Sequence, residues 1–149
     1  MKFVLCFDDY VCERLIGFSI PVENEVAVIS YESIHIVPLT QPRIIRNYED
    51  FAEGGDAYDS RNQILHFHDR CYSMLGLHGG TPKLGSRNGE RLIFSSDNQF
   101  QVLDPHGNEI FRHQFNDLSG DWKFITFSED ENYILLGLPY SLQIFQRVS

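Results

Sequence analysis

The chain has 149 residues, of which 42% are apolar and 13% aromatic, which is enough for one domain with its own core and excludes a disordered chain. Its 12 basic and 21 acidic residues give a formal charge of −9, which argues against nucleic acid as a partner, because Lys and Arg supply most of the affinity for phosphates. The apolar run at the start is too short and too soon followed by charges to read as a signal peptide, and no apolar run reaches about 18 residues. The cysteines fit no metal-binding spacing, so we expect a cytoplasmic protein without a membrane segment.

The first predicted elements are two hairpins. Apolar and β-branched residues predict strands at Lys2 to Phe7 and at Val11 to Ile20, joined by an acidic turn. Pro21 ends this pair, and a second hairpin runs from Val26 to Val37. We therefore expect residues 2–39 to form one four-stranded antiparallel meander.

The next stretch, residues 40–61, loses strand character. Ile44, Ile45, Tyr48 and Phe51 recur at the spacing of one helix face, and Gly54 with Gly55 can end a helix. We expect a short helical or loop insertion here, between the first meander and the second.

Two further meanders are predicted, in residues 62–104 and 109–146. Each is expected to contain a leading hairpin followed by a second hairpin. The leading hairpins pair Asn62 to Phe67 with Cys71 to Leu77, and Glu109 to Phe115 with Trp122 to Phe127. The second hairpins run from Leu92 to Asp104 and from Ile134 to Gln146.

The second hairpin of each meander repeats one pattern. V-A-V-I-S is followed by I-H-I-V, L-I-F-S-S by F-Q-V-L, and I-L-L-G-L by L-Q-I-F, and each following run starts 8 residues after the first one starts. The polar position of these runs is His35, Gln101 or Gln143. Because strands alternate, these residues most simply form a polar face, although in a ring they could line one groove together. Internal repeats of about 42 residues are typical of stacked structural units.

Two segments resemble blades of a WD-repeat β-propeller. Lys123 to Phe145, KFITFSEDENYILLGLPYSLQIF, has an inner strand, a polar turn and two further strands in the order of such a blade. Ser86 to Phe111 resembles a neighbouring blade, with Leu103 and Asp104 where that family often has Trp-Asp. The chain has no Gly-His and no Trp-Asp dipeptide, so the resemblance is to blades in general. It implies an all-β chain in which residues 1–149 form a single propeller-like domain.

Three blades are too few to close a ring, which usually needs about four to eight. An unclosed array would leave strand edges and apolar end faces open to another chain. We therefore expect either a homodimer, in which two copies complete one ring, or a protein partner that fills the open end. A monomeric β-sandwich is the alternative.

The histidines His66, His68 and His78 are the only group that suggests a metal. Side chains alternate along a strand, so positions 66 and 68 share one face and both imidazoles could reach one ion. This pattern leaves a metal-dependent enzyme in a small β-barrel as an alternative function. Surface histidines are the simpler interpretation.

Loops on rigid blades usually hold partners. The Gly-rich loop from His78 to Glu90 carries two basic residues on an otherwise acidic protein, and the insertion and the last turn carry exposed aromatic residues. The candidate partner-binding residues are Lys83, Arg87, Tyr48, Phe51 and Tyr140.

The sequence contains no arrangement of a nucleophile, a base and an acid that would indicate covalent catalysis. We therefore expect a non-enzymatic protein-interaction module that needs no cofactor. The small size and acidic charge leave a further alternative, an inhibitor or immunity-type protein that neutralises a basic enzyme.

Overall fold

Every regular element is a β-strand in the part of the chain that the computed structural model describes, residues 2–9, 14–31, 33–48, 57–117 and 120–148. The all-β fold expected from the sequence is confirmed. Within these residues no helix is long and apolar enough to cross a membrane. The strands are β1 (Lys2–Asp9), β2 (Leu15–Ser19), β3 (Glu25–Ser30), β4 (Ile34–Pro38), β5 (Arg46–Tyr48), β6 (Tyr58–Asp59), β7 (Ile64–Phe67), β8 (Arg70–Gly76), β9 (Arg91–Ser96), β10 (Gln99–Leu103), β11 (Glu109–Gln114), β12 (Phe124–Phe127), β13 (Tyr133–Leu138) and β14 (Ser141–Val148).

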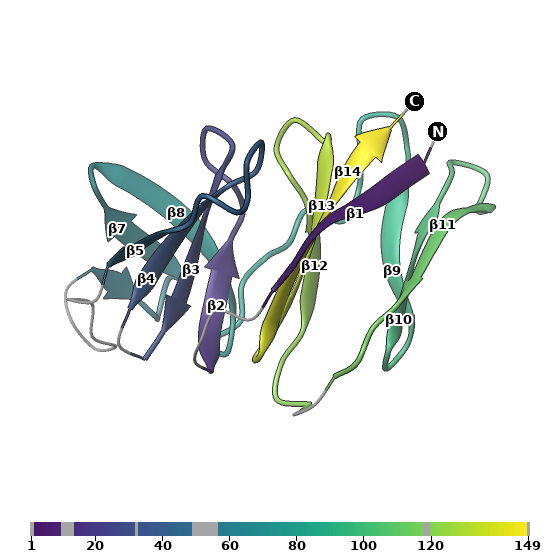
Figure 1. Cartoon of the computed structure of the whole chain (residues 1–149). Helices are drawn as coiled ribbons and strands as arrows, with labels where there is room; N and C mark the ends of the chain where they lie inside the picture. Colours follow the sequence, from purple (N-terminus) through teal and green to yellow (C-terminus); the bar gives the residue numbers. More distant parts are fainter. Residues whose placement is uncertain (1, 10–13, 32, 49–56, 118–119, 149) are drawn as a thin grey trace.

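These strands form three antiparallel sheets that lie side by side (Figure 1). The middle sheet has the order β1-β14-β13-β12. A seven-stranded sheet, β5-β4-β3-β2-β8-β7-β6, lies against one of its faces, and a three-stranded sheet, β11-β10-β9, lies against the other. We call these the middle, curled and outer sheets.

Two apolar layers separate the three sheets. The layer between the curled and middle sheets includes Phe18, Val28, Leu135 and Ile144. The layer between the middle and outer sheets includes Phe100, Val102, Phe127, Leu136 and Phe145. Strand β13 is therefore buried on both faces, which explains its continuous apolar sequence.

The repeated hairpins form as expected, but their grouping into meanders is wrong. β3 pairs with β4, β9 with β10, and β13 with β14. The predicted leading hairpins differ: β1 pairs with β14 instead of β2, and β11 pairs with β10 instead of β12. β7 does pair with β8, but β8 then joins β2 and not β9. The sheets therefore contain four, seven and three strands instead of four each, because local patterning does not specify which distant strand lies alongside.

The helix expected in the insertion is also wrong where the structure describes it. Residues 41–44 form a turn and Arg46–Tyr48 forms β5, which pairs with β4. The apolar residues do not share one face, because Ile45 packs on the layer beside the middle sheet whereas Tyr48 packs inside the curled sheet. Residues 49–56 lie outside the described residues.

Strand β1 contributes to both apolar layers. Its pairing with β14 contains an irregularity at Cys6, between Leu5 and Phe7. Phe3 and Phe7 would share a face in a regular strand, but one extra residue between them reverses the alternation. Phe3 therefore packs between the middle and outer sheets, and Phe7 between the middle and curled sheets.

The two ends of the stack are covered, contrary to the open apolar end faces expected from the sequence. At one end, the curled sheet folds back on itself, so that Ile29, Ile36, Tyr72 and Met74 are buried inside it. At the other end, the outer sheet presents polar side chains that bond one another. Gln101 and Arg112 both bond Glu109, and Gln99 bonds Ser95 and Gln114.

Substituting Gly137 by Ala tests how closely the middle and curled sheets approach. A Cβ at Gly137 would overlap the ring of Phe18, which is fully buried. We expect Gly137→Ala to lower the free energy of unfolding by about 1–3 kcal/mol, the usual cost of overpacking a core. Urea unfolding followed by the fluorescence of the single tryptophan, Trp122, measures this change.

Gly85→Ala is the matched control, because the nearest atom to a Cβ at Gly85 lies 3.8 Å away. A loss of stability of the same size in both variants would contradict the close contact at Gly137.

Candidate protein-binding edge

Strand β1 lies at the edge of the middle sheet. One side of its backbone pairs with β14 from Lys2 to Asp9, and no other strand of the described residues lies on its second side. An edge strand presents a row of unpaired N–H and C=O groups, which can accept a strand from another chain. Its Val, Leu and Phe residues give this segment its strand preference.

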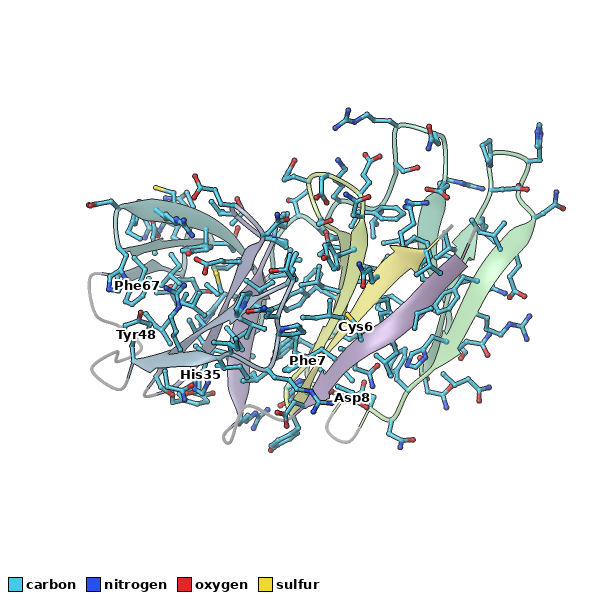
Figure 2. The ribbon with its side chains drawn as sticks, turned by 45° about the horizontal axis from the view of Figure 1, so that its top comes forward. Cys6, Phe7, Asp8, His35, Tyr48 and Phe67 are labelled. Carbon is cyan, nitrogen blue, oxygen red and sulfur yellow. The ribbon has the colours of Figure 1, made fainter. Side chains whose placement is uncertain are left out.

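Apolar side chains are exposed along this edge. Val4 is 46% exposed and Leu5 is 40% exposed, and Cys6, at the bulge, is exposed as well. Figure 2 shows Cys6, Phe7 and Asp8 following one another along β1. Three consecutive apolar residues on an open edge are unusual for a folded protein, which normally protects its edges with charges or proline.

A cavity of about 530 Å³ lies beside β1. One wall is the segment Leu5 to Asp9, and the other is formed by Arg43 and Ile45 of the curled sheet's β4 to β5 connection. Ile44, between these two residues, is 59% exposed. We call this cavity and the outer side of β1 the edge groove.

The edge groove is lined by apolar and charged residues together. Asp8 and Asp9 are exposed at the end of β1, and Arg43 contributes a positive charge on the opposite wall. The Cys6 thiol donates a hydrogen bond to the Ile144 carbonyl oxygen at 3.3 Å, and burial raises the pKa of this thiol. The dimensions of this groove can hold an extended peptide.

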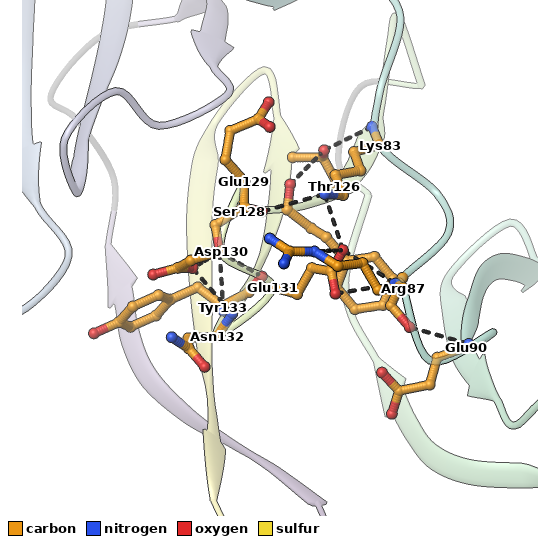
Figure 3. Close-up of polar contacts among 12 residues, drawn as sticks. Lys83, Arg87, Glu90, Thr126, Ser128, Glu129, Asp130, Glu131, Asn132 and Tyr133 are labelled. Carbon is orange, nitrogen blue, oxygen red and sulfur yellow. Dashed lines mark hydrogen bonds and ion pairs between the residues drawn. The ribbon is translucent and has the colours of Figure 1, made fainter.

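The predicted contact residues Lys83 and Arg87 bind within the chain. Lys83 Nζ lies 2.9 Å from Glu131 Oε2, and the backbone N–H of Arg87 donates to the same carboxylate at 3.1 Å (Figure 3). The hydrogen bond from Lys83 is the main reason why the pKa of Glu131 is lowered. The Arg87 side chain remains 81% exposed, with its Nε 3.9 Å from Glu131 Oε2.

A buried ion pair lies next to this contact. Arg147 of β14 donates two hydrogen bonds to the Glu90 carboxylate, at 2.8 and 2.9 Å, and its guanidinium lies 4.7 Å from the centre of the Phe3 ring. Arg147 also donates to the Glu131 carbonyl oxygen at 2.9 Å. Together these contacts fix the Gly-rich connection onto the middle sheet. Of the two basic residues predicted in this loop, Lys83 therefore has a structural contact, whereas Arg87 uses its backbone N–H and keeps its side chain exposed.

The predicted aromatic contact residues are not brought together. Tyr48 packs edge-on against Phe67, with ring centres 4.9 Å apart, inside the curled sheet (Figure 2). Tyr140 is 38% exposed in the turn between β13 and β14. Phe51 lies outside the described residues.

The three predicted metal ligands occupy different surroundings. β7 ends at Phe67, and His68 with Asp69 forms the turn to β8 with positive φ at both residues, so His66 and His68 do not share a strand face. His66 Nδ1 lies 3.4 Å from Cys71 Sγ, whereas His78 packs near Tyr58. In the part of the chain that is described, no group of three or more His, Cys, Asp or Glu residues could hold a metal ion.

The three polar positions of the repeat belong to three different sheets. His35 is buried and hydrogen-bonded to Ser33 in the curled sheet. Gln101 bonds Glu109 in the outer sheet, and Gln143 in the middle sheet bonds His113 of the outer sheet at 2.9 Å. Each side chain is used by its own neighbours instead of lining a common groove.

The sequence did not reveal the edge groove. Lys2 to Phe7 reads as half of a local hairpin with the next segment, whereas its partner β14 lies at the other end of the chain. The one available signal is the run Val4-Leu5-Cys6, which keeps an apolar residue at every position instead of alternating.

Two comparisons with known proteins found no match. No protein-family model matches the chain, and no curated protein matches it significantly. The function is therefore argued from the structure of the site.

Removing the buried ion pair should destabilise the fold strongly. We expect Arg147→Ala to lower the free energy of unfolding by about 3–5 kcal/mol, because Glu90 is left buried and charged without its partner. Arg112→Ala, which removes an exposed pair with Glu109, is the control and should cost less than about 1 kcal/mol. Urea unfolding of both variants measures the difference.

The same pair gives a pH dependence. The hydrogen bonds from Arg147 lower the pKa of Glu90. The stability from this shift is present above the unfolded pKa of about 4.3 and is lost as the pH falls through the lower folded value. Arg147→Ala should therefore lose less stability than the wild-type protein over this pH range. An equal loss in both proteins would contradict the assignment to this ion pair.

His113 should make stability depend on pH near neutrality. It bonds Gln143 and packs 4.7 Å from the Phe145 ring centre, and burial lowers its pKa. Stability from neutral His113 is present above the unfolded pKa of about 6.5 and is lost as the pH falls toward the lower folded value. We expect the free energy of unfolding to be lower at about pH 5.5 than at about pH 7.5. This difference should be smaller in His113→Gln than in the wild-type protein.

His106→Gln is the matched control, because His106 is exposed in a turn. An equal reduction of the pH effect in both variants would contradict the role of His113.

Proposed function

We propose that this chain is a non-enzymatic protein-interaction module, a propeller-like stack of antiparallel sheets that binds a partner protein at the edge groove. The open β1 edge is the observation that carries this proposal. It joins an unpaired backbone edge to exposed Val4 and Leu5 beside a cavity of about 530 Å³. In strand addition, the unpaired backbone edge provides affinity, and the side chains and cavity beside it provide specificity.

The blade-like character of the sheets supports the propeller part of the proposal. The three repeated hairpins lie in three neighbouring sheets, and the middle sheet is a four-stranded antiparallel unit of the kind found in propeller blades. The curled sheet departs from this pattern, because β8 pairs with the side of β2 that faces away from β3.

A partner protein fits the structure better than a second copy completing a ring. Stacking another copy on the outer sheet would desolvate Gln99, Gln101 and Arg112, which already bond neighbouring side chains. The far end of the stack is covered by β6, β7 and β8. The edge groove remains as the surface available to another chain.

We expect light scattering across a dilution series to give a mass near 17.3 kDa at every concentration. The immobilised protein should then retain one partner protein from an extract of the source cells, with one mole of partner per mole of immobilised protein. The two purified proteins should form the same complex when they are mixed. Leu5→Lys should abolish this complex, because it places a charge in the apolar part of the edge.

Leu77→Lys is the matched control, because Leu77 is 41% exposed and Leu5 is 40% exposed. A stable dimer that Leu5→Lys dissociates would make a second copy the occupant of the groove. Complexes that survive Leu5→Lys, or that Leu77→Lys also abolishes, would contradict the proposed site.

A further inference from the structure

The edge strands differ in how well they are protected. β5 and β6 have only three and two residues. β11 carries the charged residues Glu109 and Arg112, which discourage pairing with another strand. β9 and β12 receive cover from the Gly-rich connection, because Leu92 N–H donates to the Leu84 carbonyl and Phe127 N–H donates to the Lys83 carbonyl. Among the described strands, β1 is the long edge with an uncharged stretch, Phe3 to Phe7, and its charged residues Asp8 and Asp9 lie at its end.

The walls of the edge groove favour an extended segment with apolar side chains. An added strand places alternate side chains on the two faces of the middle sheet, next to Val4 on one face and Leu5 on the other. A side chain on the curled-sheet side would reach the cavity that Phe7 and Ile45 line. Covering these residues removes exposed apolar surface from water, which favours binding.

The charges favour a basic segment. Asp8 and Asp9 follow directly after the apolar part of β1, and among the described residues that line the cavity Arg43 is the one basic residue. The whole chain carries a formal charge of −9, so a basic segment is attracted over a longer range and an acidic one is repelled. A second copy of this chain would bring the same negative charge.

From the open backbone, the apolar walls and the acidic end, we propose that β1 takes an extended basic segment of a partner protein as an additional strand of the middle sheet. This inference rests on the proposed function and specifies its partner. The segment pairs its backbone with β1, places an apolar side chain in the cavity beside Ile45, and places Lys or Arg next to Asp8 and Asp9.

A library of random peptides of about twelve residues, selected on the immobilised full-length protein, is the probe. We expect the selected peptides to alternate apolar residues with other types and to contain Lys or Arg. Leu5→Lys should weaken their binding at least about tenfold, the effect of a central contact, whereas Leu77→Lys should leave it unchanged. Asp8→Asn should weaken binding roughly threefold at low salt, with Asp97→Asn as the exposed acidic control.

The free cysteines locate the peptide on the protein. Cys6 lies on β1, and Cys71 lies on β8 in the curled sheet. With a peptide at about ten times its dissociation constant, roughly nine in ten molecules are occupied, so alkylation of Cys6 should slow about tenfold while that of Cys71 is unchanged. Mass spectrometry of the digested protein separates the two sites.

Selection of acidic or wholly polar peptides, no selected peptide at all, or unchanged alkylation of Cys6 would overturn this inference. If a folded partner is still captured in a manner that depends on Leu5, the proposed function stands and only the basic strand is rejected. If neither peptides nor a partner depend on Leu5, both proposals fail.

Discussion

The pairing of β1 with β14 is the interaction on which the rest of the structure depends. It joins the first strand to the last and gives the middle sheet its fourth strand. The bulge at Cys6 then directs Phe3 into one apolar layer and Phe7 into the other, so one strand fastens both neighbouring sheets. Closing so long a loop costs conformational entropy, and the burial of both rings offsets that cost.

The polar contacts around β14 strengthen the same region. Arg147, near the end of this strand, binds the Glu90 carboxylate and lies over the Phe3 ring. Glu131, from the turn that precedes β13, holds Lys83 and the backbone of Arg87. The connection between the curled and outer sheets is therefore bound to the strand pair that joins the chain ends, and buried charges are acceptable there because each has a partner.

The strand that completes the middle sheet is also the strand we propose for binding. A closing strand has a neighbour on one side only, so its second side stays available unless the protein protects it. Val4 and Leu5 are exposed for this reason, while Phe3 and Phe7 on the same strand are buried. The residues of this segment that stabilise the fold differ from those that we propose for recognition, so substitutions at Leu5 can separate binding from folding.

The sequence alone determined that the chain is all-β and located the three repeated hairpins, because alternating apolar residues and tight turns are local properties. Three expectations from the sequence were wrong. These were that β1 pairs with β2, that the segment containing β5 is helical, and that His66 and His68 share one strand face. Only the tertiary structure decided that β1 pairs with β14, that the ends of the stack are covered, and that Lys83 and Arg87 bind Glu131. These features depend on contacts between segments that are distant in the chain. The alternation of apolar residues specifies which face of a strand is buried, but it does not specify which strand lies beside it.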